Sequence, residues 1–158
     1  QHVLSYNPKL KAVVTQNIDG LHQAAGSKRV LELHGNWTRL ECTGCGARST
    51  IDDFDEARAG RVPHCPSCSA VVRLDIVFYG EALDPATLEG AVLAIAGADM
   101  LIVGGTSLAV YPAAGLIDYY QGGRLVLMNA TPTPYDGRAD LIIHEPIGRV
   151  FAQIQGNV

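Results

Sequence analysis

The sequence predicts an α/β fold, in which a parallel sheet has helices on both faces and a small zinc-ribbon module is inserted into the chain. Short apolar runs typical of buried strands alternate along the chain with helical segments. Strands that alternate with helices form parallel sheets with right-handed crossovers. Two Cys-x-x-Cys pairs interrupt this alternation at one point in the chain, and we predict that the inserted module lies there.

Runs rich in Val, Leu and Ile predict the strands. We expect strands at 11–16, 29–34, 99–103, 124–128 and 141–143, and extended segments at 37–42 and 73–79 on either side of the cysteines. After their first residues, Asp99 and Arg124, the runs at 99–103 and 124–128 are continuously apolar, as in strands that are covered on both faces.

Local signals at helix ends predict four helices, at 52–59, 84–96, 112–121 and 146–154. Asp84 can cap the second of these and Pro85 suits its first position, while Gly97 ends it. The elements outside the cysteines predict one Rossmann-like domain, formed by residues 1–41 and 71–158. Residues 42–70 form the predicted zinc module.

Composition excludes several classes of protein. The chain has 158 residues, of which 47% are hydrophobic and 18% charged, and its formal charge is −4. These values exclude a disordered, collagenous or coiled-coil chain. The chain has no block of basic residues that would indicate a nucleic-acid or lipid partner, and no apolar run is long enough to span a membrane. The polar start, without a signal peptide, predicts a cytoplasmic protein. The missing initiator Met predicts that this chain is a piece of a longer protein.

The four cysteines have the spacing of a zinc site. They form the pairs Cys42/Cys45 and Cys65/Cys68, separated by nineteen residues, and two such pairs supply four thiolate ligands. Four sulfurs leave no position for water, so we expect a structural ion. Two disulfides, inert thiols, or His64 as a ligand are the alternatives, and disulfides are disfavoured without a secretory signal.

Polar and glycine residues follow the predicted strands. In parallel α/β sheets, ligands bind outside the carboxyl ends of the strands. Residues 16–20 follow the first strand, 34–35 the second and 104–107 the third, and Asn129 follows the fourth. Such residues suit phosphate and ribose groups, although ordinary strand-end turns would have the same composition.

Five motifs, in order along nearly the whole chain, resemble the sirtuins, which are NAD-dependent protein-lysine deacylases, in a bacterial form. They are TQNIDGLH at 15–22, ELHG at 32–35, the two cysteine pairs, DIVFYGE at 75–81 and GTSLAVYPAA at 105–114. Sirtuins begin with a glycine-rich Gly-Ala-Gly-x-Ser loop that this chain lacks. We therefore expect a C-terminal portion that is inactive by itself.

The resemblance implies a reaction and a base. Sirtuins remove an acyl group, here expected to be acetyl, from protein lysines, with NAD as co-substrate and nicotinamide and O-acyl-ADP-ribose as products. His34 then corresponds to the catalytic base, since a neutral imidazole can accept a proton near pH 7, and Asn17 assists it. The alternative for His34 is a histidine packed at a strand end. We expect His22 to have a structural role.

The resemblance also implies two groups of NAD contacts. They are Gln16, Asn17, Ile18 and Asp19 around the nicotinamide and its ribose, and Gly105, Thr106, Ser107 and Asn129 around the phosphates and adenosine. For Asn17, Asp19 and Asn129, the alternative is turn capping, which their side chains perform well.

The acylated peptide is expected to add as a strand, a binding mode that needs no particular peptide sequence. By resemblance, the contacts are Val77, Phe78, Tyr79, Gly80 and Glu81. The hydroxyl of Tyr79 either alters the acyl preference or faces solvent, and Phe78 is equally expected as a core residue.

Two other functions remain as alternatives: an NAD-dependent ADP-ribosyltransferase, and a zinc-bearing module that binds nucleotide or acyl-lysine without turnover. A zinc hydrolase or deaminase is disfavoured. The chain lacks the H-x-E, H-E-x-x-H and G-x-S-x-G patterns of those enzymes.

Overall fold

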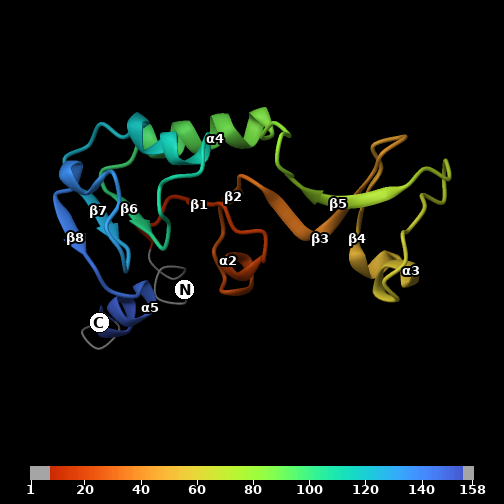
Figure 1. The fold of residues 1–158 in the computed structure, drawn as a ribbon, viewed down its shortest axis with the longest axis horizontal. Helices are drawn as coiled ribbons and strands as arrows, with labels where there is room; N and C mark the ends of the chain where they lie inside the picture. The colour runs from red at the N-terminus through yellow and green to blue at the C-terminus, as the bar shows by residue number, and fades with distance from the viewer. Residues whose placement is uncertain (1–7, 155–158) are drawn as a thin grey trace.

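The computed structural model describes residues 8–154, whose strands lie in three sheets (Figure 1). The strands are β1 (Val13–Thr15), β2 (Val30–Glu32), β3 (Gly35–Cys42), β4 (Arg48–Thr50), β5 (Val72–Ile76), β6 (Leu101–Gly104), β7 (Leu125–Met128) and β8 (Leu141–Ile143). The α-helices are α2 (Leu21–Ala24), α3 (Asp55–Arg58), α4 (Pro85–Ala96) and α5 (Ile147–Ile154), and the 3-10 helices are η1 (Ile51–Asp53), η2 (Ala113–Tyr119) and η3 (Asp136–Arg138). None of the helices within 8–154 is both long and apolar enough to cross a membrane.

The predicted parallel pairing is confirmed, but it is divided between two sheets. β1 pairs with β2, and β6, β7 and β8 form a second parallel sheet in that order. Val14 and Leu31 of the first sheet pack against the same buried cluster as Leu101 and Val103 of the second. The two sheets therefore share one hydrophobic core, although no described strand joins β1 to β6.

Helices cover both faces of the second parallel sheet, as predicted. All four residues of β7 are buried. Leu125 and Leu127 belong to the large core that also contains residues of α4 and η2. Val126 and Met128, on the opposite face, pack against Phe151 of α5. Because successive strand residues point to opposite faces, the apolar run of β7 is buried by two layers of helix.

Three expectations about individual elements were wrong. β6 is not covered on both faces: Leu101 and Val103 pack on the core, whereas Ile102 and Gly104 are exposed, and among the described strands β6 is at the edge of its sheet. The helix predicted at 52–59 divides at Phe54 into η1 and α3, because Thr50 and Asp53 form a separate capping box. The helix predicted at 112–121 is the 3-10 helix η2.

The α4 helix begins as its sequence predicts. The Asp84 carboxylate accepts a hydrogen bond from the Thr87 backbone N–H at 2.7 Å, and Pro85 occupies the first helical position. The helix ends before Gly97. This helix connects the antiparallel part of the molecule to the second parallel sheet (Figure 1).

The third sheet is antiparallel, in the order β4-β3-β5 (Figure 1). Cys42 ends β3, and the other three cysteines lie in the segments that connect the strands. This sheet has its own small core, formed by Leu40, Cys42, Cys65 and Val72. The sheet begins at Gly35 and ends at Ile76, so its strands extend on both sides of the segment 42–70. We call residues 35–76, which contain this sheet and the four cysteines, the zinc lobe.

Gly35, where β3 begins, is held against the backbone of β5. It pairs with Ile76, and its φ of +78° lies in the left-handed region that favours glycine. A Cβ atom at this position would overlap the carbonyl group of Asp75. Glycine is therefore required at position 35 for two reasons, its φ angle and the lack of space.

We predict that Gly35→Ala destabilises the protein by roughly 2–5 kcal/mol, which combines a left-handed alanine with overpacking. The control is Gly60→Ala, because Gly60 has a similar φ of +70° but nothing within 4 Å of an added Cβ. That variant should lose only about 1–2 kcal/mol. Denaturant unfolding measures both, and equal losses would contradict the steric argument.

Candidate functional site

The four cysteine sulfurs form one compact cluster in the zinc lobe. All four ligand atoms lie within 4.8 Å of one another. The Sγ atoms of Cys42 and Cys68 are 3.4 Å apart, and those of Cys45 and Cys65 are 3.7 Å apart. A tetrahedral zinc ion with bonds of about 2.3 Å separates its sulfurs by about 3.8 Å. The cysteines are free thiols and therefore fit a four-sulfur zinc site.

Backbone N–H groups favour the thiolate form of two of these cysteines, Cys42 and Cys65, whereas the pKa values of Cys45 and Cys68 are raised, chiefly by the neighbouring sulfurs. The N–H groups of Gly44 and Cys45 donate to the Cys42 Sγ at 3.4 and 3.5 Å. Chiefly through the bond from Cys45, they lower the pKa of Cys42 to about 6. Backbone bonds from Ser67 and Cys68 also lower the pKa of Cys65. Thiolates are the form of cysteine that binds a metal. The alternative ligand, His64, is not part of the cluster found among residues 8–154.

His34 lies between two backbone contacts, in the turn that joins β2 to β3. Its Nδ1 atom is 3.0 Å from the Gln16 carbonyl oxygen. Because a carbonyl can only accept, Nδ1 carries the proton of the neutral ring and Nε2 is left as the proton acceptor. The His34 carbonyl accepts from the Val77 N–H at 3.0 Å. His34 is half-buried, and no residue within 8–154 is hydrogen-bonded to its Nε2 atom.

Residues 16–19 form a loop directly after β1. The Asn17 N–H donates to Thr15 Oγ1 at 3.1 Å, and the Ile18 carbonyl accepts from the Trp37 N–H at 3.0 Å. Gln16 and Ile18 are half-buried, whereas Asn17 and Asp19 are exposed. The loop is therefore tied to β1 and to β3.

The side chain of Asp19 closes a turn in front of a short helix, as the turn-capping alternative predicts. Its Oδ1 atom accepts from the Leu21 N–H at 3.0 Å, at the start of α2. The helix α2 itself was not predicted, because four residues carry no detectable periodicity. One carboxylate oxygen of Asp19 thus has a local role, and the other is the one that can accept from a ligand.

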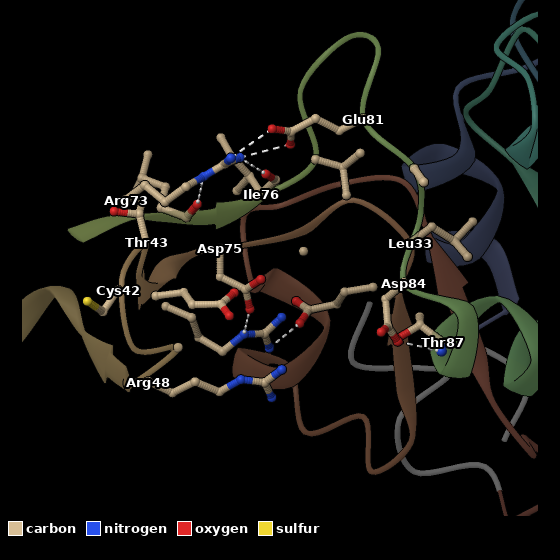
Figure 2. A pocket seen from close by; sticks show the side chains of 18 residues that line it. Leu33, Cys42, Thr43, Arg48, Arg73, Asp75, Ile76, Glu81, Asp84 and Thr87 are labelled. Atoms are coloured by element: carbon tan, nitrogen blue, oxygen red, sulfur yellow. Dashed lines mark hydrogen bonds and ion pairs between the residues drawn. The ribbon is translucent and has the colours of Figure 1, made fainter. Parts of the chain in front are cut away.

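Residues 77–81 continue from β5 as an exposed turn, and Glu81 closes it. Arg73 donates to both Glu81 carboxylate oxygens, at 2.7 and 2.8 Å, and the two side chains point toward one another in Figure 2. Glu81 also accepts from the Phe78 N–H at 3.1 Å. These bonds, chiefly the one from Arg73, lower the pKa of Glu81 to about 2. Glu81 is therefore engaged within its own turn.

The aromatic residues of this turn differ in their surroundings. The Arg73 guanidinium lies over the Phe78 ring, 4.9 Å from its centroid, while about half of the Phe78 residue surface is exposed. Tyr79 is fully exposed and Val77 half-buried. Phe78 is thus not a core residue, and Tyr79 faces solvent. Gly80 has a φ of +87° in this turn.

The other predicted NAD contacts follow two neighbouring parallel strands. Gly105 comes after β6, has a φ of +66° and donates its N–H to the Met128 carbonyl at 3.0 Å. Thr106 Oγ1 accepts from the Leu108 N–H at 3.2 Å, and Ser107 is exposed. Asn129 follows β7. Its side chain donates to the Thr131 carbonyl at 2.8 Å, which is again a turn cap.

A groove of about 960 Å³ lies between the zinc lobe and the start of α4 (Figure 2). Its lining includes charged residues that sequence reasoning did not select, such as Glu32, Arg39, Arg48 and Arg73. It includes Val77 and Glu81 but neither His34 nor the loop 16–19. The groove is therefore adjacent to the predicted reaction centre and does not contain it.

We predict that Cys65→Ala reduces zinc to less than half an equivalent and unfolds residues 42–70. The small core of the zinc lobe depends on the ion, because a structural zinc contributes on the order of 10 kcal/mol of apparent binding energy. Ser67→Ala, in the same Cys-x-x-Cys loop, keeps every sulfur and should retain the metal. Metal analysis and amide hydrogen exchange measure both effects. Well-folded wild-type protein without zinc would contradict the assignment.

Comparison with known proteins gives consistent results. A family model described as the Sir2 family matches residues 2–112. An NAD-dependent protein deacetylase from Clostridium acetobutylicum is 50% identical over 146 residues, which are 92% of this chain and 59% of that protein. The chain thus spans about three fifths of the length of this curated relative.

Solved structures agree in both fold and sequence. A structure of Sir2 with a p53 peptide and NAD+ has a TM-score of 0.88 and 39% identity, and it covers 98% of this chain and 68% of that one. A Sir2 bound to an acetylated peptide has a TM-score of 0.89 and 38% identity, with the same coverage. These matches confirm the resemblance noted in the sequence, and the chain belongs to the Sir2 family.

Proposed function

We propose that this protein is an NAD-dependent protein-lysine deacylase that removes acetyl groups. The observation that carries the proposal is the placement of His34. Its Nδ1 is bonded to the Gln16 carbonyl, and its own carbonyl is bonded to Val77 of the segment proposed to bind acyl-lysine. We also propose a cytoplasmic location, because zinc-binding thiols persist in reducing compartments.

The reaction needs a group that accepts a proton from a ribose hydroxyl. NAD supplies, as a co-substrate, the ribose carbon that the acyl oxygen attacks as nicotinamide leaves. The Nε2 atom of His34 then takes the proton of a ribose hydroxyl, and that oxygen attacks the acyl carbon. The C–N bond to the lysine then breaks and the amine leaves with a proton, while one water molecule completes the transfer. The products are nicotinamide, free lysine and O-acyl-ADP-ribose. The tautomer set by the Gln16 carbonyl supports this role, because it leaves Nε2 unprotonated.

The acylated peptide is proposed to add along residues 77–81. The turn is exposed around Tyr79 and Gly80, and the ion pair between Arg73 and Glu81 holds its shape. Recognition through backbone groups selects no particular peptide sequence. The relative with an acetylated peptide supports acyl-lysine as the substrate class.

Residues 16–19 and 105–107, with Asn129, are proposed to bind NAD. Both loops follow the carboxyl ends of parallel strands, where α/β sheets bind nucleotides. Asn17 is proposed to orient the ribose or a water molecule beside His34. The four cysteines would hold a zinc ion that stabilises the fold and takes no part in the reaction.

The decisive experiment uses the chain completed with the part of the Clostridium acetobutylicum relative that the match does not cover. The zinc-loaded protein is incubated with NAD and an acetylated peptide, and mass spectrometry follows both products. We expect deacetylated peptide and O-acetyl-ADP-ribose in equal amounts, and neither without NAD. An ADP-ribosylated protein product, or no product at all, would overturn the proposal.

In that protein, we predict that His34→Ala lowers the rate of deacetylation 10²- to 10⁴-fold, the usual loss when a general base is removed. Nicotinamide exchange precedes the proton transfer and should decrease much less. The assay compares the two rates under the same conditions.

The matched control is His22→Ala. His22 is half-buried, and its carbonyl accepts a bond from the Ser27 N–H within the loop after α2. We expect this variant to lose stability and to keep its turnover. If His22→Ala stops turnover in a stable protein while His34→Ala remains active, the base has been assigned to the wrong histidine.

A second variant tests the nicotinamide contact. Asp19→Asn keeps an oxygen that can close the turn before α2, but it replaces a charged acceptor by an NH₂ group. The loss of a charge-assisted bond to the carboxamide corresponds to roughly 1.5–3 kcal/mol, so we predict at least a tenfold increase in the Kd for NAD. Calorimetric titration measures it, and unchanged inhibition by nicotinamide would count against the contact.

A further inference from the structure

The buried polar side chains of the described chain gather around His34. Within residues 8–154, the polar or charged residues found buried are Thr15, Glu32 and Asn36. Thr15 pairs with Glu32 across the first parallel sheet, and Glu32 and Asn36 lie two residues before and two residues after His34. Burying polar groups is unfavourable unless they are fully hydrogen-bonded. Their concentration here therefore indicates a role in positioning.

Glu32 is the centre of this cluster. Only 6% of its side chain is exposed. Its Oε1 atom accepts from Asn36 Nδ2 at 2.7 Å, and its Oε2 atom accepts from Arg39 at 2.7 Å. The two bonds satisfy both carboxylate oxygens, and the bond from Asn36 closes the turn that carries His34.

Arg39 extends the cluster to the other side of the site. Its Nε atom donates to Asp75 Oδ2 at 2.9 Å, so one guanidinium joins Glu32 of β2 to Asp75 of β5. The bonds lie where the pairing of β3 with β5 is interrupted, because the register shifts between Asn36 and Leu40. Arg39 thus supplies a cross-link where backbone hydrogen bonds are missing.

We propose that Glu32, Arg39 and Asp75 form a positioning network, which sets the His34 base relative to the acyl-lysine segment. This inference rests on the proposed function. Glu32 acts on the base, since it lies before His34 and is bonded to Asn36 after it, across the turn that carries His34. Asp75 acts on the peptide, because it lies two residues before Val77. Arg39 couples the two effects, and none of the three is assigned contact with the reacting atoms.

The network predicts a separation of kinetic constants. Glu32→Gln should lower kcat about tenfold with little change in the peptide KM, because misplacement of a base slows the chemical step. Asp75→Asn should raise the peptide KM several-fold and leave kcat nearly unchanged. Arg39→Met should produce both effects, and Arg39→Lys, which restores the charge without the planar fork, should recover only part of them.

The control is Arg48→Met. Arg48 lines the same groove from β4 (Figure 2), and within the described residues it has no hydrogen bond to Glu32 or Asp75. This variant should have wild-type constants. Zinc content and the midpoint of thermal unfolding are measured for every variant, to separate loss of position from loss of fold.

Each outcome supports or overturns the network. Wild-type kcat and KM in Glu32→Gln, Asp75→Asn and Arg39→Met would overturn it. Full activity in Arg39→Lys, when Arg39→Met is impaired, would also overturn it, because the charge alone would then be enough. If Glu32→Gln does not fold, Asp75→Asn decides, because it leaves Glu32 paired with Arg39, and an unchanged peptide KM then overturns the network. All variants are made in the completed protein of the decisive experiment, and inactivity of its wild-type form with NAD and acetylated peptide would instead refute the proposed function.

Discussion

The backbones of Gly35 and Asp75 lie so close together that no side chain fits between them. This approach lets β3 pair with β5 immediately after the turn that carries His34, and the hydrogen bond from Val77 to the His34 carbonyl extends the pairing. A single backbone contact therefore sets the distance between the proposed base and the proposed peptide segment. Only glycine combines the required positive φ with the missing Cβ, so this residue constrains the whole site.

The contact between Gly35 and Asp75 depends on the stability of the zinc lobe, because both residues belong to its sheet. Its buried core contains only four residues, two of which are Cys42 and Cys65. A core of this size cannot fold unaided, and a metal is the usual substitute for the missing apolar area. β3 begins beside His34 and ends at Cys42, while β5 begins near the cysteines and ends at Ile76. A zinc ion without a catalytic role would thus still control the geometry of the reaction centre.

The sequence could predict what depends on local signals. The cap of Asp84 on α4, the apolar run of β7 and each Cys-x-x-Cys pair are formed by residues only a few positions apart, and the structure contains all three features. Pairings between distant residues were not predictable. The division of the parallel strands into two sheets depends on which strands become neighbours. The bonds of Arg39 depend on an interrupted register, and the closure of the turn by Glu81 depends on Arg73, eight residues away.

The orientation of His34 depends on main-chain rather than side-chain chemistry. In many active sites a carboxylate orients the histidine and also stabilises its charged form. Here the partner of Nδ1 is the carbonyl of Gln16, so the tautomer is fixed by the path of the loop after β1, whatever side chain stands at position 16. The buried carboxylate nearby is instead bonded to Asn36 and Arg39. The structure thus separates two tasks: the loop chooses which nitrogen is basic, and the charged network determines where that nitrogen lies.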